Sequence, residues 1–196
     1  MNQGVLDKIS LDQKYWIQLI NGEKDALGFL FDIYSNDMYL YGYRIHANKE
    51  IVKDAIQDVF VDLWEYRKNL AHVENVKFYL LKCLRNSLLK QIEKPNLLEL
   101  NQISDSFGAF PAIDYNIVLE EEERSTKYRI ERMLGELSNR EREIISLKYY
   151  SGLKITEIAN VLELKDQTVA NTLQNALGKL RKLFVFNVLL IYFLFF

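Results

Sequence analysis

The sequence of 196 residues contains few of the residues that cross-link, bend or interrupt a chain. It has one cysteine, two prolines, eight glycines and two histidines. Cys83 has no partner for an internal disulfide, and so few glycines and prolines do not suit the frequent turns of an all-β protein. His46, His72 and Cys83 are too scattered for a metal site, so we expect neither metal nor cofactor.

Motifs of catalysis are also missing from the sequence. It has no glycine-rich phosphate loop, no HExxH or CxxC spacing, and no acid pair with a histidine base. We therefore expect no enzymatic activity and no small-molecule substrate. The N-terminus lacks the charged start and apolar run of a cleavable signal, which, with the single cysteine, favours the cytoplasm.

Charge is distributed unevenly along the chain, although the net charge is only −2. Residues 1–94 carry 13 basic and 13 acidic residues. Residues 95–126 carry one basic and seven acidic residues, and residues 127–196 carry 11 basic and seven acidic residues. Both prolines, Pro95 and Pro111, lie in the acidic middle part. We predict a flexible linker at 95–116 between two domains, at 1–94 and 117–184, and an apolar tail at 185–196.

Apolar residues recur at helical spacing in both predicted domains, and no segment sustains the alternation of a strand. The pattern is clearest from Val52 to Trp64, which follows i, i+3, i+4, i+7 throughout. The predicted helices cover residues 26–46, 52–64, 76–94, 117–136, 139–150, 154–163 and 166–190. The predicted fold class is therefore all-α, with two helical modules.

Residues 155–173 have the spacing of a helix-turn-helix, in which a small residue such as Ala159 lets two helices cross closely. The outward face of the second helix offers polar side chains that can read base edges: Gln167, Thr168, Asn171, Thr172 and Gln174. Between Asp166 and Gly178 this helix has no Lys or Arg, so contacts to phosphate must come from its surroundings. The candidates are Lys165, Lys179, Arg181 and Lys182, with Lys148 and Lys154 on the preceding elements. An ordinary helical hairpin with a solvated polar face is the alternative interpretation.

Two sets of motifs resemble bacterial sigma factors of the extracytoplasmic-function (ECF) group. The stretches LSNREREII at 137–145 and EIA at 157–159 are similar to their region 4. The stretches DAIQDVFVDLW at 54–64, NVKFYL at 75–80 and RNSL at 85–88 are similar to their region 2. The resemblance implies an alternative sigma factor that binds core RNA polymerase, reads −10 and −35 promoter elements and promotes strand opening.

The resemblance further implies that the first of the region 2 stretches docks on the clamp helices of core polymerase, while region 4 meets the flap. The residues assigned to this docking are Asp54, Gln57, Asp58, Val61 and Asp62. The three aspartates recur every four residues and form an acidic stripe that suits a basic partner helix. A solvated helix face is the alternative, and Val59, Phe60 and Trp64 are expected in the core.

In the family, the following helix recognises and melts the −10 element. By resemblance, the −10 contacts are Lys77, Tyr79, Lys82, Arg85, Asn86 and Lys90, and the loop at 69–75 matches the base-capturing loop. Tyr66 and Phe78 are neighbouring aromatic residues that can stack on unpaired bases. Core packing is the alternative for Tyr79, because its spacing with Cys83 and Leu84 is that of a buried face.

One residue departs from the family pattern. Glu163 stands where many relatives have glycine, at the turn between the two region 4 helices. A left-handed turn costs a residue other than glycine about 1 kcal/mol or more, so we expect a turn of different shape here.

The last residues, 183–196, are apolar apart from Asn187 and the Tyr192 hydroxyl. Fourteen helical residues span ~21 Å, less than the ~30 Å core of a bilayer, so no transmembrane span is expected. We favour packing within the chain or against a partner such as an anti-sigma factor; a membrane surface and self-association are the alternatives.

Two other functions fit parts of the sequence. A helix-turn-helix regulator that is not a sigma factor needs only the C-terminal domain, and a decoy binds polymerase without opening DNA. Neither the promoter sequence nor the inducing signal follows from these residues.

Overall fold

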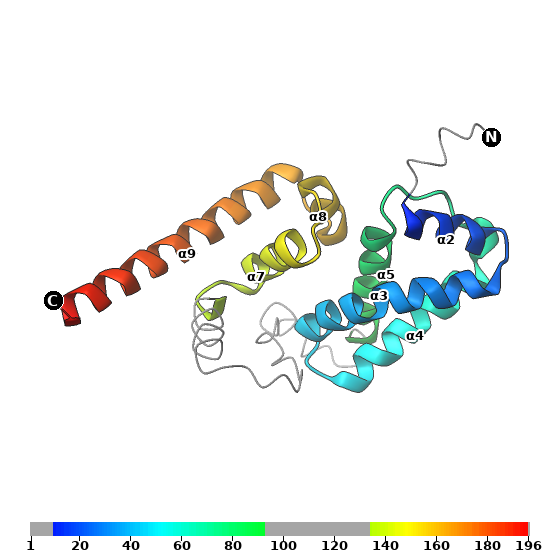
Figure 1. Cartoon of the computed structure of the whole chain (residues 1–196), viewed down its shortest axis with the longest axis horizontal. Coiled ribbons are helices and arrows are strands. Elements are labelled where there is room, and N and C mark those ends of the chain that lie inside the picture. Colours follow the sequence, from blue (N-terminus) through cyan, green and yellow to red (C-terminus); the bar gives the residue numbers. More distant parts are fainter. Residues whose placement is uncertain (1–9, 93–133, 196) are drawn as a thin grey trace. The chain divides into compact units, whose positions relative to one another are not determined.

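The structure is a computed structural model that describes residues 10–92 and 134–195. The chain divides into two compact units, Met1–Leu100 and Asn101–Phe196. In the described residues every regular element is a helix and none is a strand, which confirms the all-α prediction (Figure 1). The linker predicted at 95–116 and nearly all of the helix predicted at 117–136 lie outside the described residues, and the predicted domain boundaries stay a prediction.

The N-terminal unit is a bundle of helices in which α3 packs against three others (Figure 1). Its described elements are α2 (Leu11–Ile20), α3 (Lys24–Ile45), α4 (Lys49–Glu65), the short 3₁₀ helix η1 (Arg67–Asn69) and α5 (Val76–Ile92). The three helices predicted in this region are all present, with starts and ends within a few residues of those expected.

The core of this unit lies between α3, α4 and α5. Leu30, Met38, Val52 and Leu84 are completely or almost completely buried in it. Gly42 allows the helices to approach, because a Cβ at this position would lie 2.8 Å from Val52 Cγ1. Any larger residue at 42 would therefore push α4 away from α3.

Helix α2 was not expected from the sequence. Ser10 precedes it, and the Ser10 backbone N–H donates to Gln13 Oε1 at 3.2 Å, as in one half of a capping box. Two side chains of this helix, Trp16 and Leu19, are fully buried. A Ser-x-x-Gln start followed by apolar residues at helical spacing was the signal that would have identified α2.

The C-terminal unit consists, in its described part, of α7 (Asn139–Ile145), the π-helical turn η2 (Ser146–Tyr150), α8 (Ile155–Leu162) and α9 (Asp166–Phe195). The helix predicted at 139–150 is thus α-helical only in its first half. The Ser151 N–H donates to Ser146 O at 3.1 Å, five residues back, which is the bond of a π-turn.

Helices α8 and α9 form the predicted helix-turn-helix. Ile158, Ala159, Leu162 and Val169 are buried where the two helices meet. Glu163 ends α8 in the left-handed region, with φ 56° and ψ 42°. The expectation of a differently shaped turn was wrong, because this chain keeps a left-handed turn with a glutamate in it.

Helix α9 continues without interruption from the helix-turn-helix across the boundary predicted at residue 184. The helix predicted at 166–190 is therefore longer than expected. None of the described helices combines the length and the apolar character needed to cross a bilayer.

Candidate functional site

The acidic stripe predicted on α4 is present on the surface. Asp54, Gln57, Asp58 and Asp62 are all exposed, and the side chain of Val61 is 55% exposed between them. Asn48 starts this helix by accepting hydrogen bonds from the backbone N–H groups of the next turn. The stripe thus combines negative charge with one exposed apolar residue on a helix, a combination that can meet a basic protein surface.

The inner face of α4 accounts for the neighbouring apolar residues. Val59 and Phe60 are buried, as expected. Trp64 was expected in the core but is only half-buried, and the Arg67 guanidinium lies 4.1 Å from the centre of its ring. Arg67 Nη1 also donates to the backbone oxygen of Trp64, so the end of α4 and η1 are held together.

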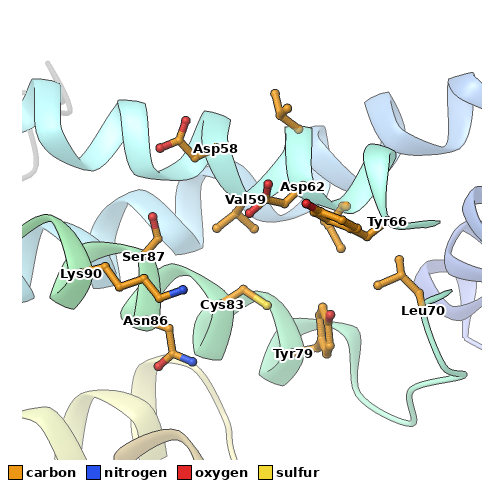
Figure 2. Close-up of a pocket in the computed structure, with 12 residues that line it drawn as sticks. Asp58, Val59, Asp62, Tyr66, Leu70, Tyr79, Cys83, Asn86, Ser87 and Lys90 are labelled. Carbon is orange, nitrogen blue, oxygen red and sulfur yellow. The ribbon is translucent and has the colours of Figure 1, made fainter. Parts of the chain in front are cut away.

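A groove of about 490 Å³ runs between α4 and α5. Figure 2 shows Asp58, Asp62 and Tyr66 on the α4 side and Tyr79, Cys83, Asn86 and Lys90 on the α5 side. The two predicted sites therefore adjoin: Asp58, Val61 and Asp62 from the docking set, and Tyr79, Asn86 and Lys90 from the −10 set, line one groove. The groove is not lined by the other residues of the two sets, which are Asp54, Gln57, Lys77, Lys82 and Arg85.

Tyr79 lines the groove and is half-buried. Its ring meets Trp16 edge-on, with the ring centres 5.1 Å apart. Burial, followed by the neighbouring Cys83 thiol, raises the pKa of Tyr79 to about 12, and burial raises the pKa of Cys83. The phenol is therefore neutral at physiological pH, as an unperturbed tyrosine also is.

The basic residues of α5 differ in their surroundings. Lys90 is exposed at the groove, whereas Lys82 and Arg85 are half-buried. Lys77 forms an ion pair with Asp37 of α3, with Nζ and Oδ2 2.6 Å apart. A phosphate contact by Lys77 would have to compete with that carboxylate.

The loop that precedes α5 is held by α2. Trp16 Nε1 donates to Ala71 O at 3.1 Å, and Gln13 Nε2 donates to Glu74 O at 2.7 Å. At the end of this loop, Asn75 Oδ1 accepts from the Phe78 N–H at 3.0 Å and starts α5. Sequence reasoning missed Gln13 and Trp16 because it did not predict α2.

The predicted −35 residues lie on α9, except Lys165, which immediately precedes it. Lys165, Gln167, Thr168, Asn171, Gln174, Lys179 and Arg181 are exposed, and Thr172 is half-buried. Gln167 Nε2 donates to Asn171 Oδ1 at 2.9 Å, and Thr172 Oγ1 donates to Thr168 O at 2.8 Å. These side chains are thus ordered on the helix and still accessible.

Lys179 also joins α9 to α7. Its Nζ lies 2.8 Å from Oε2 of Glu141, a nearly buried carboxylate that also accepts from the Ser138 N–H at 2.8 Å. Burial alone would raise the pKa of Glu141, but the hydrogen bonds from Lys179 and Ser138 outweigh it and hold the pKa below its usual value. Among the predicted DNA contacts, Lys179 therefore has a structural partner of its own.

Across the two described ranges, no group of three or more His, Cys, Asp or Glu side chains is placed to hold a metal ion. A second hollow, of about 400 Å³, lies between α3 and α4 and includes Phe31, Tyr39 and Gln57.

Both the sequence and the fold are similar to those of known proteins. Residues 127–180 match the family "Sigma-70, region 4". The chain is 23% identical over 172 residues to the ECF RNA polymerase sigma factor SigW of Bacillus subtilis strain 168. That match covers 84% of this chain and 92% of SigW.

Two solved structures have similar folds. CnrH, in complex with the cytosolic domain of CnrY, superposes with a TM-score of 0.60 and 20% identity, covering 89% of this chain and 97% of CnrH. The sigma factor RpoE of Bartonella quintana, in complex with the anti-sigma factor NepR, superposes with a TM-score of 0.55 and 20% identity, covering 80% and 95%.

Proposed function

We propose that this chain, which is a relative of the ECF sigma factors, is itself an alternative sigma factor of a bacterial RNA polymerase. It would bind core polymerase in the cytoplasm, direct it to promoters with matching −10 and −35 elements and promote strand opening. It would act as a transcription initiation factor and catalyse no reaction of its own.

The groove between α4 and α5 carries this proposal. One side presents Asp58 and Asp62 to a protein partner, and the other presents Asn86 and Lys90 to DNA. A regulator that binds only duplex DNA through α8 and α9 has no need of two such surfaces side by side. A factor that bridges polymerase and a single strand needs both.

Core docking is assigned to the stripe of Asp54, Gln57, Asp58, Val61 and Asp62 on α4, and a contact of region 4 with the flap is assigned to the C-terminal unit. The aspartates would steer a basic polymerase helix into register, and Val61 would supply the apolar contact. Charges at an exposed surface of this kind chiefly set the rate and orientation of binding.

Strand opening is assigned to α5 and the loop before it. Unstacking a base costs a few kcal/mol, which stacking and edge contacts in a pocket offset. Tyr79 and Tyr66 provide aromatic faces in the groove, while Asn86 provides an amide for base edges. Lys82, Arg85 and Lys90, with Lys77 if it leaves Asp37, would follow the phosphates.

Reading of the −35 element is assigned to α9 in a major groove. Gln167, Thr168, Asn171 and Gln174 are exposed on one helix, at the spacing with which a recognition helix meets successive bases. Lys165 and Arg181 flank this face and would contact phosphate, as would Lys179 when it leaves Glu141.

We also propose that an anti-sigma factor binds this chain. RpoE was solved with such a factor, and CnrH with a cytosolic domain of another protein, and both share this fold. The acidic and apolar surface of α4 is the part of the N-terminal unit that such a partner would have to cover to prevent polymerase docking.

Run-off transcription with core polymerase that lacks sigma factor, genomic promoter fragments and the full chain tests the proposal. We expect discrete starts that depend on the added protein. The double variant Asp58→Lys and Asp62→Lys is expected to bind core at least about tenfold more weakly, because reversed charges oppose the partner helix. The matched control is Asp25→Lys and Asp32→Lys, two exposed aspartates of α3.

Each other outcome has a definite meaning. Binding to core without any starts would contradict a sigma function and favour a decoy. Absence of core binding would leave a DNA-binding regulator. Equal core binding by the α4 variant and the wild type, with unchanged circular dichroism, would remove the docking assignment.

A further inference from the structure

The first turns of α9 present polar side chains that carry almost no charge. From Asp166 to Gly178 the only charged residue is Asp166, with which the helix begins. Val169 and Leu173 are buried in the C-terminal unit and fix the rotation of α9 about its axis. Asn171 is two residues from each of them, which is about 200° of helical rotation, so it faces away from the core.

Asn171 is joined to Gln167, one turn earlier on the same side of α9. Gln167 Nε2 donates to Asn171 Oδ1 at 2.9 Å, and both side chains are exposed. Residues four apart are neighbours on a helix surface, and a hydrogen bond between two such amides holds both side chains in place. The bond also orients the Asn171 amide, because its oxygen must lie toward Gln167 and its nitrogen on the other side.

This orientation leaves Asn171 with a donor and an acceptor side by side. The side chain of asparagine has two N–H donors and an oxygen with two lone pairs, and the bond from Gln167 uses one lone pair. Both Nδ2 hydrogens and the second lone pair of Oδ1 lie outside that bond. Adenine offers the complementary pair in the major groove, its N7 acceptor beside its N6 amino donor, and one amide can bind both.

The other bases match this side chain less well. Guanine presents two acceptors, cytosine one donor, and thymine one acceptor and a methyl group. Arg and Lys are the usual partners of guanine, and neither occurs between Asp166 and Gly178. Thr172 donates its single hydroxyl proton to Thr168 O at 2.8 Å, so its oxygen can only accept from a base. Asn171 therefore combines donor and acceptor in a fixed orientation, whereas Thr172 does not.

We propose that Asn171 reads an adenine of the −35 element and that Gln167 positions it for this contact. Nδ2 donates to N7 of the base, and Oδ1 accepts from the N6 amino group. The N-terminal residues of a recognition helix contact base edges, and Gln167 and Asn171 are the second and sixth residues of α9. The inference rests on the proposed sigma function, since it names a base that the recognition helix would select.

Transcription from a promoter library, with the full chain and core polymerase, tests this contact. The library is one promoter identified by run-off transcription, with the base pairs around −35 randomised and a transcribed barcode for each member. We expect the wild type to prefer adenine at one position by at least about fivefold, the lower end for a bidentate base contact. Asn171→Ala should lose that preference and keep the preferences at the other positions.

A modified base identifies the atoms of the contact. 7-Deazaadenine lacks the N7 acceptor but pairs with thymine as adenine does. At the selected position it should weaken wild-type transcription at least about fivefold. It should leave transcription by the Asn171→Ala variant unchanged, because that variant has already lost the contact.

Gln167→Leu tests the positioning residue, since leucine has a similar size and helix propensity but no hydrogen-bonding group. We expect the same adenine to be selected with a preference about threefold weaker, because the Asn171 amide is no longer oriented. A merely structural role would lower transcription from all library members alike. The matched control, Asn175→Ala, removes an exposed amide one turn further along α9 and should keep the wild-type preference.

The results that would overturn the inference differ from failure of the sigma function. An adenine preference equal in the wild type and Asn171→Ala, or equal weakening of both by 7-deazaadenine, would assign the contact to another residue. A guanine preference that depends on Asn171 would refute the choice of base. Starts without any position that depends on Asn171 would leave the sigma function standing, whereas absence of starts from every library member would overturn both.

Discussion

At the scale of single residues, Glu163 occupies a conformation that favours glycine. Its φ of 56° places its Cβ close to the following backbone, and the turn is retained because buried residues on both sides position α8 and α9. The Leu164 N–H donates to Ala159 O at 2.8 Å and closes the end of α8. The packing of α8 against α9 therefore outweighs the unfavourable backbone conformation of Glu163.

Replacing Glu163 by glycine should stabilise the C-terminal unit by about 0.5–1 kcal/mol, since glycine removes the strain but is more flexible when unfolded. Hydrogen exchange of the α8 and α9 amides, followed by mass spectrometry, measures this directly. Glu163→Ala is the control, because it removes the charge and keeps the Cβ. Equal protection in the glycine and alanine variants would show that the turn is not strained.

Glu141 makes the stability of the same unit depend on pH. Its folded pKa lies below the ordinary value of 4.5 because of Lys179 and Ser138. A carboxyl with a lowered folded pKa stabilises the fold above its unfolded pKa, and this contribution disappears as pH falls through the folded pKa. The contribution is therefore complete at pH 7, begins to fall near the ordinary pKa of 4.5 and is lost once the pH is below the lowered pKa of the folded state.

The variant Glu141→Gln should be less stable than the wild type by about 1–2 kcal/mol at pH 7, as expected for a charge-assisted hydrogen bond, and the difference should shrink at low pH. Hydrogen exchange of α7 and α9 at pH 7 and pH 4 checks this, after correction for the intrinsic exchange rate. A difference that does not change with pH would mean that Glu141 acts without its charge.

At the scale of elements, α2 acts as a support for the loop that precedes α5. Two of its side chains donate to the backbone of that loop, and Trp16 also contacts Tyr79 at the groove. The loop is thus fixed relative to α5 before any ligand binds. A preformed loop lowers the entropy that must be lost when a flipped base is held.

Trp16→Phe combined with Gln13→Ala should reduce promoter opening about tenfold while leaving core binding unchanged, since each lost hydrogen bond is worth about 1 kcal/mol. Permanganate reactivity of unpaired thymines reports opening, and anisotropy of labelled core reports binding. Lys14→Ala, an exposed change on the same helix, is the control. Parallel loss of both activities would instead indicate general damage to the N-terminal unit.

At the scale of the whole molecule, acidic and basic residues lie on different surfaces, although the net charge is only −2. Acidic residues lie on the exposed face of α4, and basic residues lie on α5 and at both ends of the exposed polar face of α9. Binding to a large anionic ligand therefore depends on local surfaces and not on the charge of the chain as a whole.

Lys82→Ala with Arg85→Ala should flatten the salt dependence of promoter opening. Loss of two phosphate contacts should reduce the slope of log affinity against log salt by about 1.5. Opening measured between 50 and 200 mM salt with the complete polymerase tests this, with Lys14→Ala and Lys24→Ala as the control pair. An unchanged slope would place the phosphate contacts of the −10 site elsewhere.

Much of the architecture was predictable from the sequence because helical periodicity is local. Residues within four positions of one another determine which faces of α3, α4 and α5 are buried. They also determine the buried contact between α8 and α9 and the exposure of the α4 stripe. The resemblance to sigma factors rests on such short stretches too. Helix α2 was missed although its signals, a Ser-x-x-Gln start and apolar residues at helical spacing, are equally local.

The tertiary structure alone decided which of these surfaces meet. Trp16 reaches Ala71 across 55 residues, Gln13 reaches Glu74 across 61, and Lys179 reaches Glu141 across 38. The groove that joins residues predicted for docking with residues predicted for −10 contacts likewise needs α4 and α5 side by side. Periodicity places a residue on a face of its helix, but only the packing of helices distant in sequence determines its partner.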